Sequence, residues 1–346
     1  MPGRINNPDN NMHNDLAPIV LFAYKRKDTL RQTVEALRVC TLASECDLYV
    51  FADGAKGKKD QKEVTEVRNY LKTISGFKSI SFNLSEKNRG ISHSVIEGVN
   101  KIFSKNDKVV VLEDDIVVSK NFIVFMNENL LKYQNQQSVF SISGYNYPFR
   151  VKDNEKLDAF FLPRSSSWGW ATWRDRWCDL DWEIKEYRDF SSNKDQIREF
   201  HRGGSDLFRM LKKQQIQQMD VWDVRWVYNQ FRRNGLTVYP TISKVRNVGF
   251  GQDATNTNTY NRYISEFDGG EKEDFTLPEC ISIDPFYHRQ LLKFYSLFSR
   301  IKSRLKTILF KIGLIKRPFY FVYSSILGLH LSIDPDSSIL GFLNDK

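Results

Sequence analysis

The stretch Val109-Val-Val-Leu112-Glu113-Asp114-Asp115-Ile-Val-Val118-Ser119 decides the fold. Four apolar, mostly β-branched residues before three consecutive acids predict a buried strand that carries carboxylates at its C-terminal end. Open α/β sheets bind their ligands at that edge. Because adjacent carboxylates repel one another, they favour a shared cation, and hard carboxylate oxygens suit Mg²⁺ or Mn²⁺. The alternative interpretation is a solvated acidic turn.

The chain before this stretch alternates between strand and helix patterns. Strands are predicted at 17–24, 47–54 and 78–84, and helices at 28–37, 59–74 and 91–102. In the first helix Asp28 is the predicted N-cap, and Leu30, Val34 and Leu37 share one face. The order strand, helix, strand predicts an α/β, Rossmann-like fold with a mostly parallel sheet flanked by helices.

Polar side chains follow each predicted strand. They are Tyr24 and Arg26 after the first, Asp53 after the second, Arg89 and His93 after the third, and Glu113, Asp114 and Asp115 after the fourth. Cations beside a metal are what a nucleoside diphosphate requires. No Gly-x-Gly-x-x-Gly or Walker A sequence follows the first strand, which disfavours dinucleotide and P-loop sites.

The later chain is rich in tryptophan. A strand at 138–143 precedes the segment 160–173, which includes Trp168, Gly169 and Trp170. Tryptophans at this density pack in a core or form a sugar platform, and Gly169 would let the backbone approach a ligand. A helix around Trp222 and Asp223, a strand at 236–243 and a glycine-containing loop at 247–253, expected to be mobile, complete this part. The candidate substrate-binding residues are Trp168, Gly169, Trp170 and Trp222.

The formal charge of +9 comes from the C-terminal segment. Between Pro285 and Ile333 there are nine basic residues and no acid, so the remaining chain sums to zero and a nucleic-acid partner is not expected. Apolar residues recur there at three- and four-residue steps. This pattern predicts an amphipathic helix that packs on its own domain, forms a coiled coil or lies on an anionic membrane.

The N-terminus and the cysteines bear on the compartment. Residues 1–16 are polar, and we expect them to be disordered and not to be a signal peptide or a membrane anchor. The four cysteines have no metal-ligand spacing and indicate reduced thiols. We therefore expect a cytoplasmic protein, either free or peripheral on the cytoplasmic face of the membrane.

The order of these motifs resembles the N-acetylglucosaminyltransferase I type of glycosyltransferase, over about residues 17–258. The segment Trp168-Gly169-Trp170-Ala-Thr-Trp173 is similar to that of bacterial sugar transferases from polysaccharide loci. The resemblance implies a GT-A fold that divides into a nucleotide-sugar-binding half, 17–145, an acceptor-binding half, 146–284, and the C-terminal segment, 285–346. Its implied activity is metal-dependent, inverting transfer from a UDP-linked sugar to a glycan or lipid-linked acceptor in cell-surface polysaccharide synthesis.

The resemblance also implies roles for individual residues. Asp115 would be the carboxylate nearest Mn²⁺, supported by Glu113 and Asp114. Arg26 would contact the nucleotide, and Asp53 would face the uracil ring. Asp223 would be the catalytic base, with Asp220 as the alternate base.

Two features depart from that family. The family's N-terminal membrane anchor is not apparent, and Trp222-Asp223-Val-Arg-Trp226 is one residue longer than the family's Trp-Asp-Asp-Trp. A nucleotidyltransferase and a non-catalytic carbohydrate-binding, membrane-associated protein are the alternatives. The first would carry a glycine- and lysine-rich first loop, and the second leaves the acids at three separate loop ends unexplained.

Overall fold

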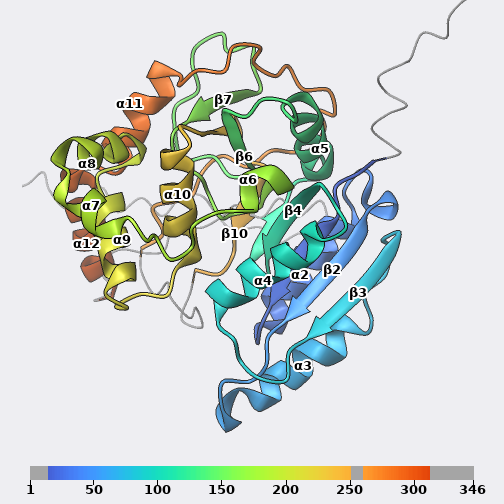
Figure 1. The fold of residues 1–346 in the computed structure, drawn as a ribbon. Coiled ribbons are helices and arrows are strands. Elements are labelled where there is room, and N and C mark those ends of the chain that lie inside the picture. Colours follow the sequence, from blue (N-terminus) through green and yellow to red (C-terminus); the bar gives the residue numbers. More distant parts are fainter. Residues whose placement is uncertain (1–14, 251–259, 312–346) are drawn as a thin grey trace, which may run out of the picture.

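The computed structural model describes residues 15–250 and 260–311. Within them, eight strands form one sheet in the order β3-β2-β1-β4-β8-β6-β9-β7, and β5 pairs separately with β10 (Figure 1). Six strands of the large sheet run in one direction, whereas β7 and β8 run antiparallel to their neighbours. The predicted Rossmann-like α/β fold with a mostly parallel sheet is confirmed.

The strands are β1 (Ile19–Ala23), β2 (Asp47–Ala52), β3 (Ser79–Leu84), β4 (Lys108–Glu113), β5 (Ile116–Val118), β6 (Val139–Ser143), β7 (Ala159–Leu162), β8 (Trp170–Trp173), β9 (Leu236–Pro240) and β10 (Val245–Asn247). The helices are α2 (Lys27–Arg38), α3 (Gln61–Leu71), α4 (Ile91–Phe103), α5 (Phe122–Lys132), α6 (Arg174–Trp177), α7 (Tyr187–Ser192), α8 (Lys194–Phe200), α9 (Leu207–Gln215), α10 (Trp222–Arg232), α11 (Pro285–Phe294) and α12 (Leu297–Lys311).

The predicted elements of the first half are present, with different ends. The apolar face of α2 is buried as predicted. Asp28 is not its N-cap, because the helix begins at Lys27 and Arg26 is the cap residue. Asp28 lies instead in the first turn, where its negative charge favours the helix dipole. The helix predicted at 59–74 is shorter, since α3 spans only Gln61–Leu71 after a 3-10 turn.

The acidic stretch forms two strands. β4 ends at Glu113, Asp114 and Asp115 make the turn, and β5 follows at once and pairs with β10. The tryptophan-rich segment contributes β8, which lies antiparallel between β4 and β6. One sheet therefore joins strands from both predicted halves of the chain.

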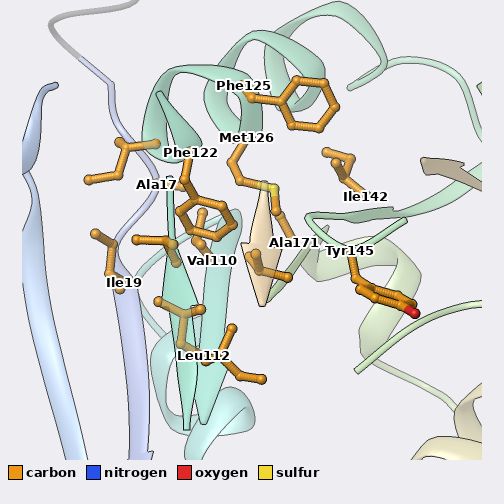
Figure 2. Close-up of a cluster of buried hydrophobic side chains, with 14 of the residues drawn as sticks. Ala17, Ile19, Val110, Leu112, Phe122, Phe125, Met126, Ile142, Tyr145 and Ala171 are labelled. Atoms are coloured by element: carbon orange, nitrogen blue, oxygen red, sulfur yellow. The ribbon is translucent and has the colours of Figure 1, made fainter. Parts of the chain in front are cut away.

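The main core lies between this sheet and α5. Figure 2 shows side chains of β1, β4, β6 and β8 meeting Phe122, Phe125 and Met126 of α5. All of the labelled residues are at most 2% exposed. The helices α7, α8, α9, α11 and α12 gather at the side of the molecule far from β2 and β3 (Figure 1). The four cysteines are unpaired, as predicted.

Candidate active site

Arg26 lies between two of the three acids at the end of β4. Its guanidinium forms an ion pair with Asp114 and a second one with Asp115, at 2.9 Å from Nη1 to Oδ2. The backbone N–H of Tyr24 donates to the other oxygen of Asp114 at 3.2 Å. Parallel strands β1 and β4 are neighbours, so the loops after them meet at the same edge of the sheet. The structure therefore brings together Tyr24, Arg26, Asp114 and Asp115 as predicted.

Asp114 is buried and Glu113 is partly buried, and burial shifts the pKa of both carboxyls. Burial, followed by the negative charges of Asp115 and Asp114, raises the pKa of Glu113 to about 8. Burial likewise raises the pKa of Asp114 to about 6, although the charge of Arg26 opposes this rise. A site of this kind favours additional positive charge.

Asp115 offers an open ligand position to a cation. Its Oδ1 is buried and has no hydrogen-bond partner among the described residues. The same residues contain no group of three His, Cys, Asp or Glu side chains arranged for a metal. However, Mg²⁺-type sites often use one or two carboxylates and complete their coordination with substrate phosphates. The orphaned oxygen of Asp115 fits that kind of site.

Gly249 closes one side of this acid cluster. A Cβ at this position would lie 2.0 Å from Oδ2 of Asp115 and 2.8 Å from Nη1 of Arg26. The neighbouring Val248 N–H donates to the backbone oxygen of Asp115 at 2.9 Å. Sequence reasoning noted the glycine content of the loop 247–253 but missed this contact. Residues 251–253 of that loop lie outside the described residues.

Asp223 reaches the site from the other half of the chain. It lies in the first turn of α10, and one of its oxygens accepts from the N–H of Val224 at 2.7 Å. Burial raises its pKa, and its own charge contributes to the raised pKa of Glu113. Asp220 is exposed and instead lies beside Gly90, where α4 begins. Of the two, Asp223 is therefore the carboxylate whose charge acts on Glu113.

A cavity of about 630 Å³ lies between the ends of β2 and β3 and the helix α4. Asp53 and Arg89 line it, as expected of residues at one sheet edge. Both oxygens of Asp53 already accept backbone N–H groups, from Gly54, Arg89 and Gly90 at 2.8–3.1 Å. Asp53 thus shapes the loop before α4. His93 is exposed on α4 and is not part of the lining.

The tryptophans predicted to bind substrate divide into two groups. Trp170 and Trp222 are 1% and 3% exposed and pack within a tryptophan core with Trp177 and Trp226. We therefore do not retain them as sugar platforms. Trp168 is only partly buried and contacts Phe250, next to Gly249. It is the tryptophan of the segment that remains available to a ligand.

Gly169 has a different role from the one predicted. Its φ of +58° favours glycine, and a Cβ would lie 2.8 Å from Val245. Its carbonyl accepts from the N–H of Gly144 at 2.6 Å. The backbone that approaches Gly169 is the protein's own, which corrects the expectation of a ligand there.

The buried ion pair of Arg164 and Asp206 acts electrostatically on Asp223. Arg164 binds Asp206 through both guanidinium nitrogens, at 2.9 and 3.1 Å, and stacks 3.8 Å from the ring centre of Tyr295. The positive charge of Arg164 partly offsets the effect of burial on the pKa of Asp223. Sequence reasoning missed this pair because its two members are 42 residues apart.

Comparison with known proteins identifies a family model. Residues 22–167 match the model of glycosyltransferase family 25, described as an LPS biosynthesis protein. This match supports a transferase enzyme, and it does not confirm the N-acetylglucosaminyltransferase I type that the motifs resemble. It includes Arg26 and the acids of β4 and ends before Asp223. None of the curated proteins matches the chain.

Solved structures resemble the chain only weakly. A mannosyltransferase from Pyrobaculum calidifontis in complex with GDP-Man and Mn²⁺ has 12% identity and a TM-score of 0.33, over 46% of this chain and 45% of that one. TarS from S. aureus has 10% identity and a TM-score of 0.34, over 66% and 37%. A cytidylyltransferase from Leptospira borgpetersenii has 12% identity and a TM-score of 0.25, over 37% and 53%. The chain thus spans about half or less of these proteins.

Proposed function

We propose that this protein is a metal-dependent, inverting glycosyltransferase that moves a sugar from a UDP-linked donor to a glycan or lipid-linked acceptor in cell-surface polysaccharide synthesis. The observation that carries the proposal is that Arg26 pairs with Asp114 and Asp115 at the end of β4, while the charge of Asp223 acts on the neighbouring Glu113. Asp223 and the β4 acids come from two halves of the chain, and the negative charge of Asp223 contributes to the raised pKa of Glu113. The family match and its description support sugar transfer in LPS-type synthesis.

The donor would bind at the carboxyl edge of the sheet. Its nucleoside would occupy the cavity lined by Asp53 and Arg89, and its diphosphate would lie near Arg26. Asp115 would hold the divalent ion through its open oxygen, with Glu113 and Asp114 adding negative charge. When bound, the ion would supply positive charge to the leaving diphosphate.

Asp223 would act as the general base. An acceptor hydroxyl oxygen attacks the anomeric carbon, the bond from that carbon to the diphosphate oxygen breaks, and the hydroxyl proton passes to the carboxylate. Inversion requires the base and the leaving group on opposite faces of the sugar. We place this base on α10, which comes from the half of the chain that does not carry Arg26 and the β4 acids.

Binding measurements test the donor and the metal. A thermal-shift panel of UDP- and GDP-sugars, with and without Mn²⁺, should show stabilisation by a UDP-sugar that requires the metal. Asp115→Asn should lose the metal-dependent shift. Asp107→Asn is the matched control, because Asp107 is exposed at the opposite end of β4. If no nucleotide stabilises the protein with or without Mn²⁺, the proposal is wrong.

A further inference from the structure

The helix α12 is amphipathic in the reverse sense of an ordinary surface helix. A helix on a globular protein normally turns its apolar face to the core. In α12 the large apolar side chains point to solvent: Leu297 is 65% exposed, Phe298 78%, Ile301 46%, Leu305 56% and Ile308 56%. At about 100° per residue these five side chains fall within one arc of about 100°. We call them the apolar face of α12.

The polar side of α12 contacts the rest of the molecule. Ser299, Ser303 and Thr307 are partly buried, and Thr307 accepts a hydrogen bond from the N–H of Tyr260 at 3.3 Å. Arg300 donates to Ser205 at 3.3 Å. These contacts fix the rotation of the helix, so its apolar face is directed outward and is not covered by the described part of the domain.

Basic residues border the apolar face on both sides. Lys302 follows one edge, Arg304 and Lys311 follow the other, and all three are exposed. Neither α11 nor α12 contains an acidic residue. A second copy of the chain would bring the same cations against this face and be repelled. An anionic bilayer complements both the apolar centre and the charged edges.

We infer that the apolar face of α12 is a docking surface for an anionic lipid bilayer, with Lys302, Arg304 and Lys311 at the level of the headgroups. Among the described residues, every helix is too short or too polar to cross a membrane. The helix would therefore lie in the plane of the surface. This inference depends on α12 alone, and its test does not depend on the proposed sugar transfer.

Vesicle flotation tests the inference with the full chain. The protein should float with vesicles of phosphatidylcholine and phosphatidylglycerol in equal amounts but not with phosphatidylcholine alone. Ile301→Glu/Leu305→Glu should remain in the soluble fraction. Val39→Glu/Ile216→Glu is the matched control, since it replaces two exposed apolar residues outside α12 and should float like the wild type.

A second variant tests the charged border. In Lys302→Gln/Arg304→Gln/Lys311→Gln, the partition coefficient should fall by about fivefold for each charge removed, because one cation contributes about 1 kcal/mol at such a surface. Release of UDP from a soluble donor should be unchanged in both α12 variants, which separates this result from the catalytic proposal. Equal flotation of Ile301→Glu/Leu305→Glu and wild type would overturn the inference. A second contrary result would be a wild-type protein that does not bind vesicles and sediments as a dimer, and that Ile301→Glu/Leu305→Glu converts to a monomer.

Discussion

Arg26 is the residue on which the acid cluster depends. Its guanidinium neutralises Asp114 and Asp115 together, and both carboxylates are buried. Removing one partner of a buried ion pair leaves an uncompensated charge, which costs far more than loss of a surface pair. A donor diphosphate or a metal ion bound as proposed would therefore enter a site in which Arg26 already compensates part of the acidic charge.

Gly249 gives a prediction at this scale. Gly249→Ala should weaken Mn²⁺-dependent donor binding and lower the free energy of unfolding by about 1–3 kcal/mol, because the added Cβ forces Asp115 or the backbone to move. Gly57→Ala is the matched control, since a Cβ there meets no atom within 4 Å. Thermal shift and urea unfolding of both variants provide the measurement. Equal behaviour of the two variants would mean that Gly249 does not define the site.

Part of this site was predictable at the residue scale. Arg26 and the acids Glu113–Asp115 follow parallel strands, so the rule that strand ends share an edge placed them together. Gly249 and the Arg164–Asp206 pair were not predictable, because their partners are distant in sequence and come together only through tertiary packing. The position of a carboxylate at a strand end also does not show whether its oxygens are free to bind a ligand. In Asp53, both oxygens accept hydrogen bonds from backbone N–H groups.

At the scale of elements, the aromatic segment shows why composition alone misleads. Trp168 and Trp170 are two residues apart, yet one contacts the loop near Asp115 and the other is core. Trp168 precedes β8 and is separated from it by Gly169, whose φ is +58°, whereas β8 begins at Trp170 and directs that ring into the tryptophan cluster. Without knowing where β8 begins, the sequence could not distinguish a platform from a core residue.

The helix α5 is held by an irregular segment that runs along it. Tyr133 donates to the carbonyl of Pro278 at 2.7 Å, and Glu128 accepts from the N–H of Phe275 at 3.3 Å. Phe275 packs edge to face on Phe125 at 5.1 Å. Burial, with smaller contributions from Asp274 and Asp158, raises the pKa of Glu128 to about 7.

This raised pKa predicts a pH dependence of stability. Because the folded protein binds the Glu128 proton more tightly than the unfolded chain, its contribution to stability is present below about pH 4.5 and is lost as the pH rises through about 7. Glu128→Gln keeps an acceptor for Phe275 and removes the charge. The melting temperature of Glu128→Gln minus that of the wild type should therefore increase as the pH is raised from 5 to 8. Glu63→Gln, on the exposed side of α3, is the control, and parallel curves for Glu128→Gln and wild type would contradict the prediction.

At the scale of the whole molecule, the site lies where two halves of one sheet meet. β1 and β4 supply Arg26 and the acids, whereas Asp223 comes from α10, which packs against α4 and the tryptophan core. The alternation of strands and helices predicted the first half well. The second half departs from that alternation, since β8 returns antiparallel to β4, and its order could not be read from local patterns.

The central claim is that Asp223 is a base acting opposite the metal and the diphosphate. The most direct test is the rate of UDP release and transfer by Asp223→Asn, measured with the donor that binds with Mn²⁺. We expect donor and metal binding to be retained and transfer to fall by about 10²–10⁴-fold, the usual effect of a missing general base. Asp220→Asn, which changes the exposed carboxylate three residues earlier, should stay close to wild type. Full turnover by Asp223→Asn, or the same loss in Asp220→Asn alone, would contradict the account.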